Sequence, residues 1–157
     1  MARLRGQKLF NTALIGAVFV VALDRFCKIM ALSFGQEKTF LLVGDFFSFA
    51  YSPNINLALS LPSLLRPLYF IPPIIIIIGY SFWKSLRQCR YQTATALGLI
   101  LCGAISNFYD RVAYGSVIDY LDLRYFTVFN LADILISVGV IYIIVQNLWL
   151  RDKPEVA

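Results

Sequence analysis

Four long apolar stretches divide the chain, at about residues 9–31, 68–83, 93–109 and 129–150. Each is close to the roughly 20 residues that an α-helix needs to cross a bilayer. The pattern predicts a mainly α, integral membrane protein, with a bundle of four transmembrane helices in a single membrane domain over residues 1–157. The first stretch could instead be a cleavable signal peptide, but its apolar run resumes after Asp24 without a small-residue cleavage site. We therefore expect a retained helix.

Two connecting segments, residues 32–67 and 110–128, lie between these helices on one side of the membrane. The first segment contains the run from Lys38 to Tyr51, which is rich in β-branched and aromatic residues and is interrupted by Gly44 and Asp45. That pattern favours short strands over another span. We expect a small extracytoplasmic, β-rich segment between the first two helices, lying on the membrane surface.

Basic residues orient the bundle, because cytoplasmic loops carry an excess of Lys and Arg. Clusters precede the first helix and follow the second and fourth helices. Both termini are therefore predicted to be cytoplasmic, and residues 32–67 and 110–128 to face outward. The clusters consist of Arg3, Arg5 and Lys8; Lys84, Arg87 and Arg90; and Arg151 and Lys153.

Composition narrows the possible chemistry. Hydrophobic residues make up 59% of the chain and charged residues 15%, which is unusual for a soluble domain. The net charge of +5 comes from clusters beside the apolar runs, so we expect no nucleic-acid partner. Histidine is absent, which excludes Ser-His and Cys-His catalysis, and the three cysteines lack metal-ligand spacing. We expect no metal, no cofactor and no structural disulfide.

Carboxylates lie near the outer end of three predicted helices. Asp24 is about 22 Å along the first helix at 1.5 Å per residue, Asp110 ends the third helix, and Asp133 begins the fourth. An ionisable residue inside a span costs about 2.5 to 3.5 kcal/mol on insertion scales, so the depth of each acid is informative. For Asp133, which has no basic residue within one helical turn, this cost favours a functional role. Asn130, Asp133 and Ser137 share one helical face.

The third predicted helix has a similar face of small or polar residues, which suits close helix packing and hydrogen bonding. This face consists of Gly103, Ser106, Asn107 and Asp110. Asp119 lies in the apolar string Val117-Ile-Asp-Tyr-Leu121. Burial and a second carboxylate both raise a carboxyl pKa, so two such acids held together share a proton. That arrangement suits aspartic proteolysis, with Asp119 and Asp133 as the pair.

Three ordered blocks of this sequence resemble bacterial lipoprotein signal peptidases, also called signal peptidase II. The blocks are Gly103-Ala-Ile-Ser-Asn-Phe-Tyr-Asp-Arg111, Gly115-Ser-Val-Ile-Asp-Tyr120 and Phe129-Asn-Leu-Ala-Asp133. The resemblance implies that Asp119 and Asp133 are the catalytic dyad. It also implies roles in orienting the dyad or the substrate for Asn54, Asn107, Asp110, Arg111, Asn130, Asp24 and Lys28. For Asp24 and Lys28, a purely structural i, i+4 salt bridge is an equally good interpretation.

Three positions depart from the family pattern. Asn56 stands where the family usually has Gly, Leu59 where it has Phe, and Arg25 where Gln is common. Asn tolerates positive φ better than other non-Gly residues, so the turn at Asn56 can keep its backbone.

The resemblance implies a prolipoprotein substrate whose cleavage-site cysteine carries a diacylglyceryl group, cut on the amino side of that cysteine. It implies a bacterial inner-membrane enzyme that acts as a monomer among membrane lipids, with its active site near the outer leaflet. A proton-coupled transporter is the main alternative, since membrane carboxylates also relay protons. A non-catalytic scaffold, or a Ser/Lys protease using Ser60 or Ser116 with Lys28, are further alternatives.

Overall fold

The computed structural model describes residues 2–55 and 67–151. They form a mainly helical protein with one small antiparallel sheet, in the order α1 (Ala2–Phe34), β1 (Thr39–Val43), β2 (Phe47–Asn54), α2 (Pro67–Arg87), α3 (Tyr91–Tyr114), β3 (Val117–Leu123), β4 (Val128–Phe129) and α4 (Leu131–Arg151). The sequence positions Asn56, Leu59 and Ser60 lie outside the described residues.

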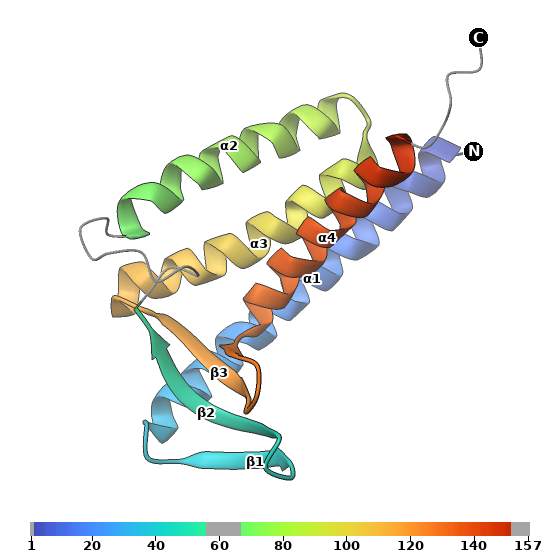
Figure 1. Cartoon of the computed structure of the whole chain (residues 1–157). Helices are drawn as coiled ribbons and strands as arrows, with labels where there is room; N and C mark the ends of the chain where they lie inside the picture. Colours follow the sequence, from blue (N-terminus) through green and yellow to red (C-terminus); the bar gives the residue numbers. More distant parts are fainter. Residues whose placement is uncertain (1, 56–66, 152–157) are drawn as a thin grey trace.

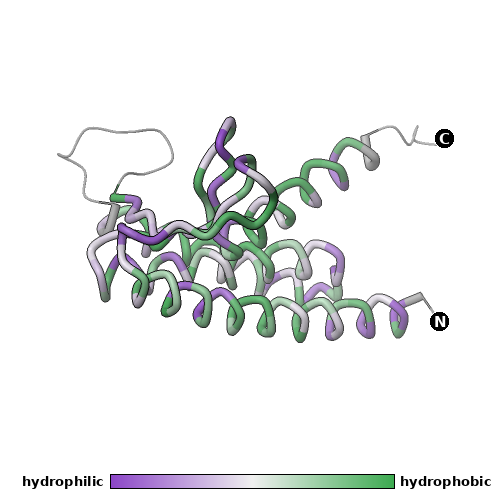
Figure 2. Tube along the Cα trace, turned by 90° about the horizontal axis from the view of Figure 1, so that it is seen from below, coloured by the Kyte–Doolittle hydropathy of each residue, from purple (hydrophilic) through white to green (hydrophobic). Residues whose placement is uncertain are grey.

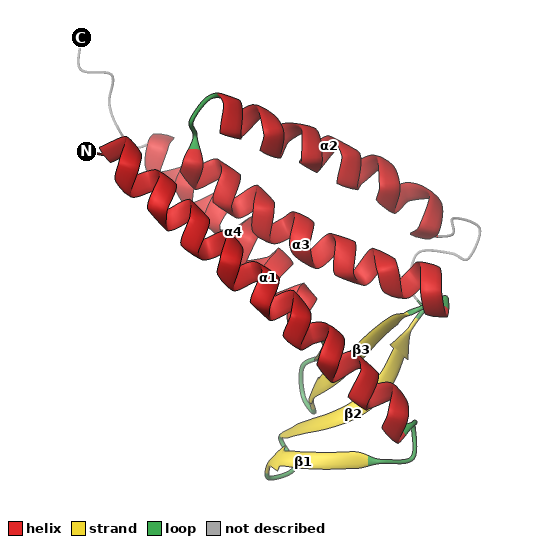
Figure 3. Cartoon of the chain, turned by 180° about the vertical axis from the view of Figure 1, so that it is seen from behind, coloured by secondary structure: helices red, strands yellow, loops and turns green. Residues whose placement is uncertain are grey.

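The four helices run side by side, and the sheet lies at one end of them (Figure 1). Helix α3 packs against α1, α2 and α4, and α1 also contacts α4. The start of α1 and the end of α4 lie together at the opposite end from the sheet, as the view from behind also shows (Figure 3). Polar groups at the sheet end of the bundle are thus remote from these two helix ends.

Helices α1, α2 and α3 extend beyond the predicted apolar stretches, whereas α4 begins at Leu131 and not at residue 129. Helix α1 begins at Ala2 and ends at Phe34, and α3 continues to Tyr114, because polar residues at their ends keep helical hydrogen bonds. Helix α3 ends where Gly115 adopts φ 76° and its N–H bonds to the carbonyl oxygen of Arg111 at 3.1 Å. A backbone position with positive φ favours glycine, so Gly115 explains why α3 ends at Tyr114.

Apolar residues run along the helices (Figure 2). Two helical segments, Tyr69–Arg87 and Leu131–Leu148, are long and apolar enough to cross a membrane. Large apolar side chains on these helices are exposed, including Ile76 at 69% and Ile141 at 60%. Such extended exposed apolar surface is typical of contact with lipid or another protein.

The sheet has the strand order β1-β2-β3-β4, with antiparallel neighbours. The expected strands between the first two helices are β1 and β2. The sheet also includes β3 and β4, which the sequence pattern had not predicted as strands. Phe129, predicted to begin the fourth helix, lies in β4 and pairs with Leu121. Ser52 pairs with Asp119 and Asn54 with Val117, so β2 brings its end next to the acidic strand.

A small apolar cluster fixes the sheet on the bundle. Ala31 of α1 packs with Ile118 and Tyr120 of β3, and all three are at most 1% exposed. The ring of Phe49 from β2 lies 5.4 Å from that of Tyr120. This cluster holds β3 against α1, so the position of Asp119 depends on the packing of its two neighbours.

Helices α3 and α4 approach closely at two glycines. A Cβ placed on Gly103 would lie 2.8 Å from Ile136 Cγ1 and closer still to the backbone carbonyl oxygen of Ala132. A Cβ on Gly139 would lie 2.7 Å from the carbonyl oxygen of Ala96. The predicted small face of the third helix is thus a close helix contact, directly beside the start of α4.

Candidate active site

Asp133 lies in the first turn of α4, where a capping box fixes it. The backbone N–H of Asp133 donates to Asn130 Oδ1 at 2.9 Å, and the N–H of Asn130 donates to Asp133 Oδ2 at 3.2 Å. Asn130 precedes the helix, so these are the reciprocal bonds of a capping residue and the third helical residue. The spacing Asn-x-x-Asp carried this signal in the sequence.

Asp119 lies on β3 and is 2% exposed. Its Oδ1 accepts a hydrogen bond from Asn130 Nδ2 at 2.6 Å, and its Oδ2 accepts one from Asn54 Nδ2 at 2.9 Å. Asn130 therefore bonds to both aspartates, through its side chain to Asp119 and through its backbone to Asp133. One residue sets the relative position of the two carboxyl groups.

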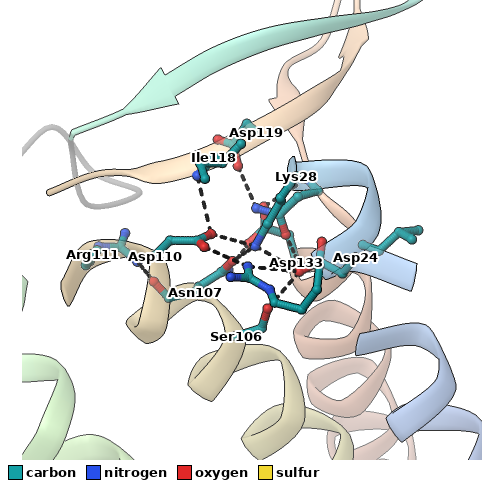
Figure 4. Close-up of polar contacts among 12 residues, drawn as sticks. Asp24, Lys28, Ser106, Asn107, Asp110, Arg111, Ile118, Asp119 and Asp133 are labelled. Atoms are coloured by element: carbon teal, nitrogen blue, oxygen red, sulfur yellow. Dashed lines mark hydrogen bonds and ion pairs between the residues drawn. The ribbon is translucent and has the colours of Figure 1, made fainter. Parts of the chain in front are cut away.

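Asn107 of α3 donates a side-chain hydrogen bond to the carboxyl group of Asp133. Its Nδ2 donates to Asp133 Oδ1 at 2.7 Å, and its Oδ1 accepts from Lys28 Nζ at 3.0 Å. Figure 4 shows Lys28 reaching from α1 between Asn107 and Asp110. The amide of Asn107 thus connects the lysine to the carboxylate.

A buried ion cluster lies beneath these groups. Lys28 Nζ lies 2.9 Å from Asp24 Oδ2 and 2.7 Å from Asp110 Oδ2, and all three residues are at most 1% exposed. Arg25 Nη2 lies 2.7 Å from Asp110 Oδ1, although without the alignment of a hydrogen bond, and the guanidinium sits over the ring of Tyr109. With two acids and two bases, the cluster is neutral.

Further hydrogen bonds tie this cluster to its surroundings. Ser106 Oγ donates to Asp24 Oδ2 at 2.7 Å, and the N–H of Ile118 donates to Asp110 Oδ2 at 3.4 Å. The second of these bonds links β3 to α3 (Figure 4). The acids of the cluster thus help to hold the strand that carries Asp119.

Tyr120 is a structural member of the site that sequence reasoning missed. Its hydroxyl donates to Asp24 Oδ1 at 3.0 Å and accepts from the N–H of Leu131 at 3.2 Å, so it joins α1, β3 and the start of α4. Burial, followed by the charge of Asp24, raises the pKa of Tyr120 far above its usual range, so the hydroxyl stays protonated. Asp24 is 96 residues away in sequence, so no local signal predicts this contact.

Burial also raises the pKa of Asp119, to about 6. The neighbouring charge of Asp133 acts in the same direction. The hydrogen bonds from Asn54 and Asn130 and the charge of Lys28 oppose it, because they favour the ionised carboxylate. The structure thus gives Asp119 a carboxyl that can gain or lose a proton near neutral pH.

Both aspartates line a cavity of about 580 Å³ between β3, α3 and α4, together with Asn54, Asn107 and Arg111. The rest of its lining is mostly apolar and includes Phe126, Phe129 and Ile134. Arg111 Nη1 donates to the carbonyl oxygen of Asn107 at 3.4 Å. Both aspartates, and the side chains of Asn54 and Asn107 that bond to them, thus lie at the wall of one mostly apolar cavity.

The structure brings every predicted site residue to the sheet end of the bundle. Asp122 is separate, because its position three residues beyond Asp119 directs it to the other face of β3, opposite Ser48. Arg124 pairs with Asp45 at 3.5 Å.

Among the described residues, Lys28 Nζ bonds to carboxylates and Asn107 and to no serine, which disfavours a Ser/Lys pair. Within residues 2–55 and 67–151, no group of three or more Asp, Glu, Cys or His side chains could hold a metal ion.

Comparisons with known proteins show a family and a fold that this chain shares. Residues 16–149 match the sequence family described as signal peptidase (SPase) II. The chain is 34% identical over 159 residues to the lipoprotein signal peptidase of Bartonella henselae, covering 94% of this chain and 96% of that one. It is 33% identical over 145 residues to the lipoprotein signal peptidase of a Staphylococcus aureus strain, covering 88% of each chain.

Two solved structures share the fold, and both are described as bacterial membrane enzymes studied by the in meso method. The first has a TM-score of 0.80 and 27% identity, covering 94% of this chain and 93% of that chain. The second has a TM-score of 0.75 and 28% identity, covering 91% and 95%. The likeness therefore extends over almost the whole length of both molecules.

Proposed function

The chain belongs to the signal peptidase II family, and from that membership we propose that it is an aspartic endopeptidase that removes signal peptides from lipoproteins. The family and the relatives identify a protease of lipoprotein precursors. The proposal adds the residues, the chemistry and the placement in the membrane.

The observation that carries the proposal is the link that Asn130 makes between Asp119 and Asp133. Two carboxyl groups that bond to one residue and line one cavity support this proposal, because an aspartic protease uses a pair of acids that shares a proton. Each carboxylate oxygen has accepted one hydrogen bond and retains a second lone pair that can face a water molecule or a substrate.

Hydrolysis follows from one ionised and one protonated carboxyl. The ionised group accepts a proton from water, and the water oxygen attacks the carbonyl carbon of the scissile bond. The protonated group donates its hydrogen to the carbonyl oxygen, which gives a gem-diol. The proton taken from water then passes to the leaving nitrogen, the C–N bond breaks, and one diol hydroxyl returns its proton to the other carboxylate.

We place all four helices across the bacterial inner membrane, with both termini cytoplasmic and the active site near the outer leaflet. The exposed apolar side chains of α1, α2 and α4 support lipid contact, and the basic clusters near the two termini support the orientation. On β1, the exposed side chains of Phe40, Leu41 and Val43 suit a sheet that rests on the membrane surface.

The substrate we propose is a prolipoprotein whose cysteine already carries diacylglyceryl, cut on the amino side of that cysteine by a monomeric enzyme. Its lipid holds the scissile bond at the membrane surface, where the cavity opens in this placement. A transporter would require polar groups at the membrane centre. Here the buried acids gather at the sheet end, and the relatives named above are peptidases.

The experiment measures initial cleavage rates of a precursor, with and without the diacylglyceryl group, by purified enzyme in lipid. We expect cleavage of the lipidated form only. Asp119→Asn and Asp133→Asn should each abolish turnover while the protein still folds, because Asn cannot exchange the proton. The double variant should be scarcely worse than either single one, since the pair acts as a unit.

Asp122→Asn is the matched control, because it lies on the same strand and faces away from the pair. It should keep most of the wild-type rate. Substantial turnover by either single dyad variant would remove that residue from the mechanism. Equal cleavage of the lipidated and unlipidated precursor would contradict the proposed substrate.

A further inference from the structure

A second cavity, of about 590 Å³, lies at the end of the bundle opposite the candidate active site. Residues near the starts of α1 and α3 and in the last turns of α4 line it, and these helix ends lie together in Figure 1. Its volume lies within the range of roughly 300 to 1,000 Å³ that is typical of sites for small ligands. Most of the lining is polar, and the polar side chains include Arg3, Arg90, Gln92, Thr93, Gln146 and Asn147.

Contacts between three helices shape this cavity. A Cβ on Gly6 of α1 would lie 3.5 Å from the ring of Tyr91, the first residue of α3, and that ring lies 6.1 Å from the ring of Phe10. From α4, Gln146 Nε2 donates to Thr93 Oγ1 at 3.4 Å. The walls of the cavity therefore come from the packed bundle and not from a single segment.

The two guanidinium groups of the cavity have no carboxylate partner in the part of the chain that the structure describes. Arg3 Nη2 donates to Cys89 Sγ at 2.8 Å, and a thiol is only a weak acceptor. The ion pairs among the described residues include neither Arg3 nor Arg90. The cavity thus carries two positive charges that no described carboxylate neutralises.

The acidic residues lie in other parts of the bundle. Within the described ranges, all of them fall between residues 24 and 45 or between residues 110 and 133, toward the sheet. The remaining two, Asp152 and Glu155, follow α4 and lie outside the described residues. The described surroundings of the cavity therefore attract an anion without opposition from a nearby acid.

The donors of the cavity suit a phosphate group. The planar fork of a guanidinium matches two phosphate oxygens, and it matches a carboxylate equally well. The hydroxyl of Thr93 and the amides of Gln146 and Asn147 add uncharged donors. The surroundings of the cavity distinguish between the two anions.

Exposed apolar side chains adjoin the cavity. Leu9 follows Gly6 by about one turn of α1 and is 64% exposed, and Ile144, next to the lining residue Ile143, is 52% exposed. In the proposed membrane placement, this end of the bundle lies in the cytoplasmic leaflet, where such side chains contact acyl chains. Basic cavities between membrane helices on the cytoplasmic side are typical sites for the headgroups of anionic lipids, which carry their charge on phosphate.

We propose that this cavity binds the phosphate group of an anionic phospholipid from the cytoplasmic leaflet, with Arg3 and Arg90 as its charged contacts. The bound lipid joins α1, α3 and α4 at the end of the bundle remote from the aspartate pair. This role rests on the proposed membrane placement and not on the peptidase activity.

The test measures how phosphatidylglycerol affects the purified, full chain in a neutral detergent, by native mass spectrometry and thermal unfolding. One lipid should bind saturably and raise the melting temperature, because a ligand of the folded state stabilises it. Three probes should have little effect: phosphatidylcholine, which is neutral overall; diacylglycerol, which lacks phosphate; and inorganic phosphate, which lacks acyl chains. Equal stabilisation by inorganic phosphate would overturn the lipid assignment, and equal stabilisation by either neutral lipid would overturn the anionic site.

Two double variants separate this site from general attraction between opposite charges. Arg3→Gln with Arg90→Gln should weaken phosphatidylglycerol binding by about tenfold for each arginine, since hydrogen bonds to charged groups are the strong ones. Arg5→Gln with Lys84→Gln removes the same charge from the same end of the bundle, but neither residue lines the cavity. This control should bind almost as tightly as wild type. Equal losses in both double variants would leave only diffuse attraction and refute the site.

Gly6→Leu tests the cavity if the arginine variant does not fold. Its Cβ would meet Tyr91 at an ordinary contact distance, and the longer side chain should fill part of the cavity at unchanged net charge. Phosphatidylglycerol binding should weaken, and wild-type binding would contradict the proposal. Failure of the peptidase function has a different signature, namely turnover by Asp119→Asn or Asp133→Asn.

Discussion

Gly103→Ala should slow cleavage by pushing the start of α4 away from α3. The added Cβ would lie 2.8 Å from Ile136 Cγ1 and closer to the carbonyl oxygen of Ala132. Carbon atoms in contact are about 3.5 Å apart or more, so the two helices must separate by at least about 0.7 Å. The oxygen belongs to the backbone, and no side-chain rotation relieves that clash.

The displaced residue precedes Asp133, so the carboxyl moves with it. A misplacement of about 1 Å in a catalytic group can cost about 100-fold in rate. We expect kcat/KM to fall by about tenfold to 100-fold. Overpacking should also lower the free energy of unfolding by about 1 to 3 kcal/mol. Initial rates on the lipidated precursor and thermal unfolding in the same lipid measure both effects.

Two other glycines provide the controls. A Cβ on Gly79 would meet nothing within 4 Å, so Gly79→Ala should keep the rate and stabilise its helix by about 0.5 to 1 kcal/mol. A Cβ on Gly139 would clash with α3 at 2.6 Å, but farther along α4 from Asp133. Gly139→Ala should therefore match the loss of stability and lose less rate. A wild-type rate in Gly103→Ala would refute this account of how α4 positions the carboxyl.

Three further perturbations test separate parts of the structure. Asn54→Ala removes a hydrogen bond that favours ionised Asp119, so the pKa of that carboxyl should rise above about 6. The pH–rate profile should then move to higher pH by about half a unit to one unit. A profile that moves to lower pH would contradict this direction. Tyr120→Phe removes the hydroxyl that bonds to Asp24 Oδ1 and to the backbone N–H of Leu131. It should lower the free energy of unfolding by about 2 to 3 kcal/mol, measured by thermal unfolding beside wild type. A cysteine at Gln88, in a background without the native cysteines, should react with an impermeant thiol reagent only after the cells are opened; labelling of intact cells would reverse the proposed orientation.

The helices and the acids could be predicted from the sequence because their signals are local. Apolar runs of spanning length predicted all four helices, and the cost of burying a carboxylate singled out Asp133. The participation of β3 in the sheet could not be predicted, since it depends on pairing with β2, whose partners, such as Asn54 for Val117, lie far away in the sequence. The joint contact of Lys28 with Asp110 and Asn107 likewise depends on how α1 packs on α3. The Asn130–Asp133 capping box was local, and its spacing could have been recognised.

The positions of β3 and α4 in the sequence determine the order in which the residues of the candidate site are synthesised. When a ribosome has made the first three helices, the chain already contains Asn107 but lacks its carboxylate acceptor, Asp133, in the first turn of α4. Asp119 is synthesised shortly before it and needs Asn130, which immediately precedes that helix. A nascent or truncated chain therefore holds the supporting groups without the pair. With Asp119 and Asp133 as the proposed pair, we expect a chain to gain protease activity only once the fourth helix is in place.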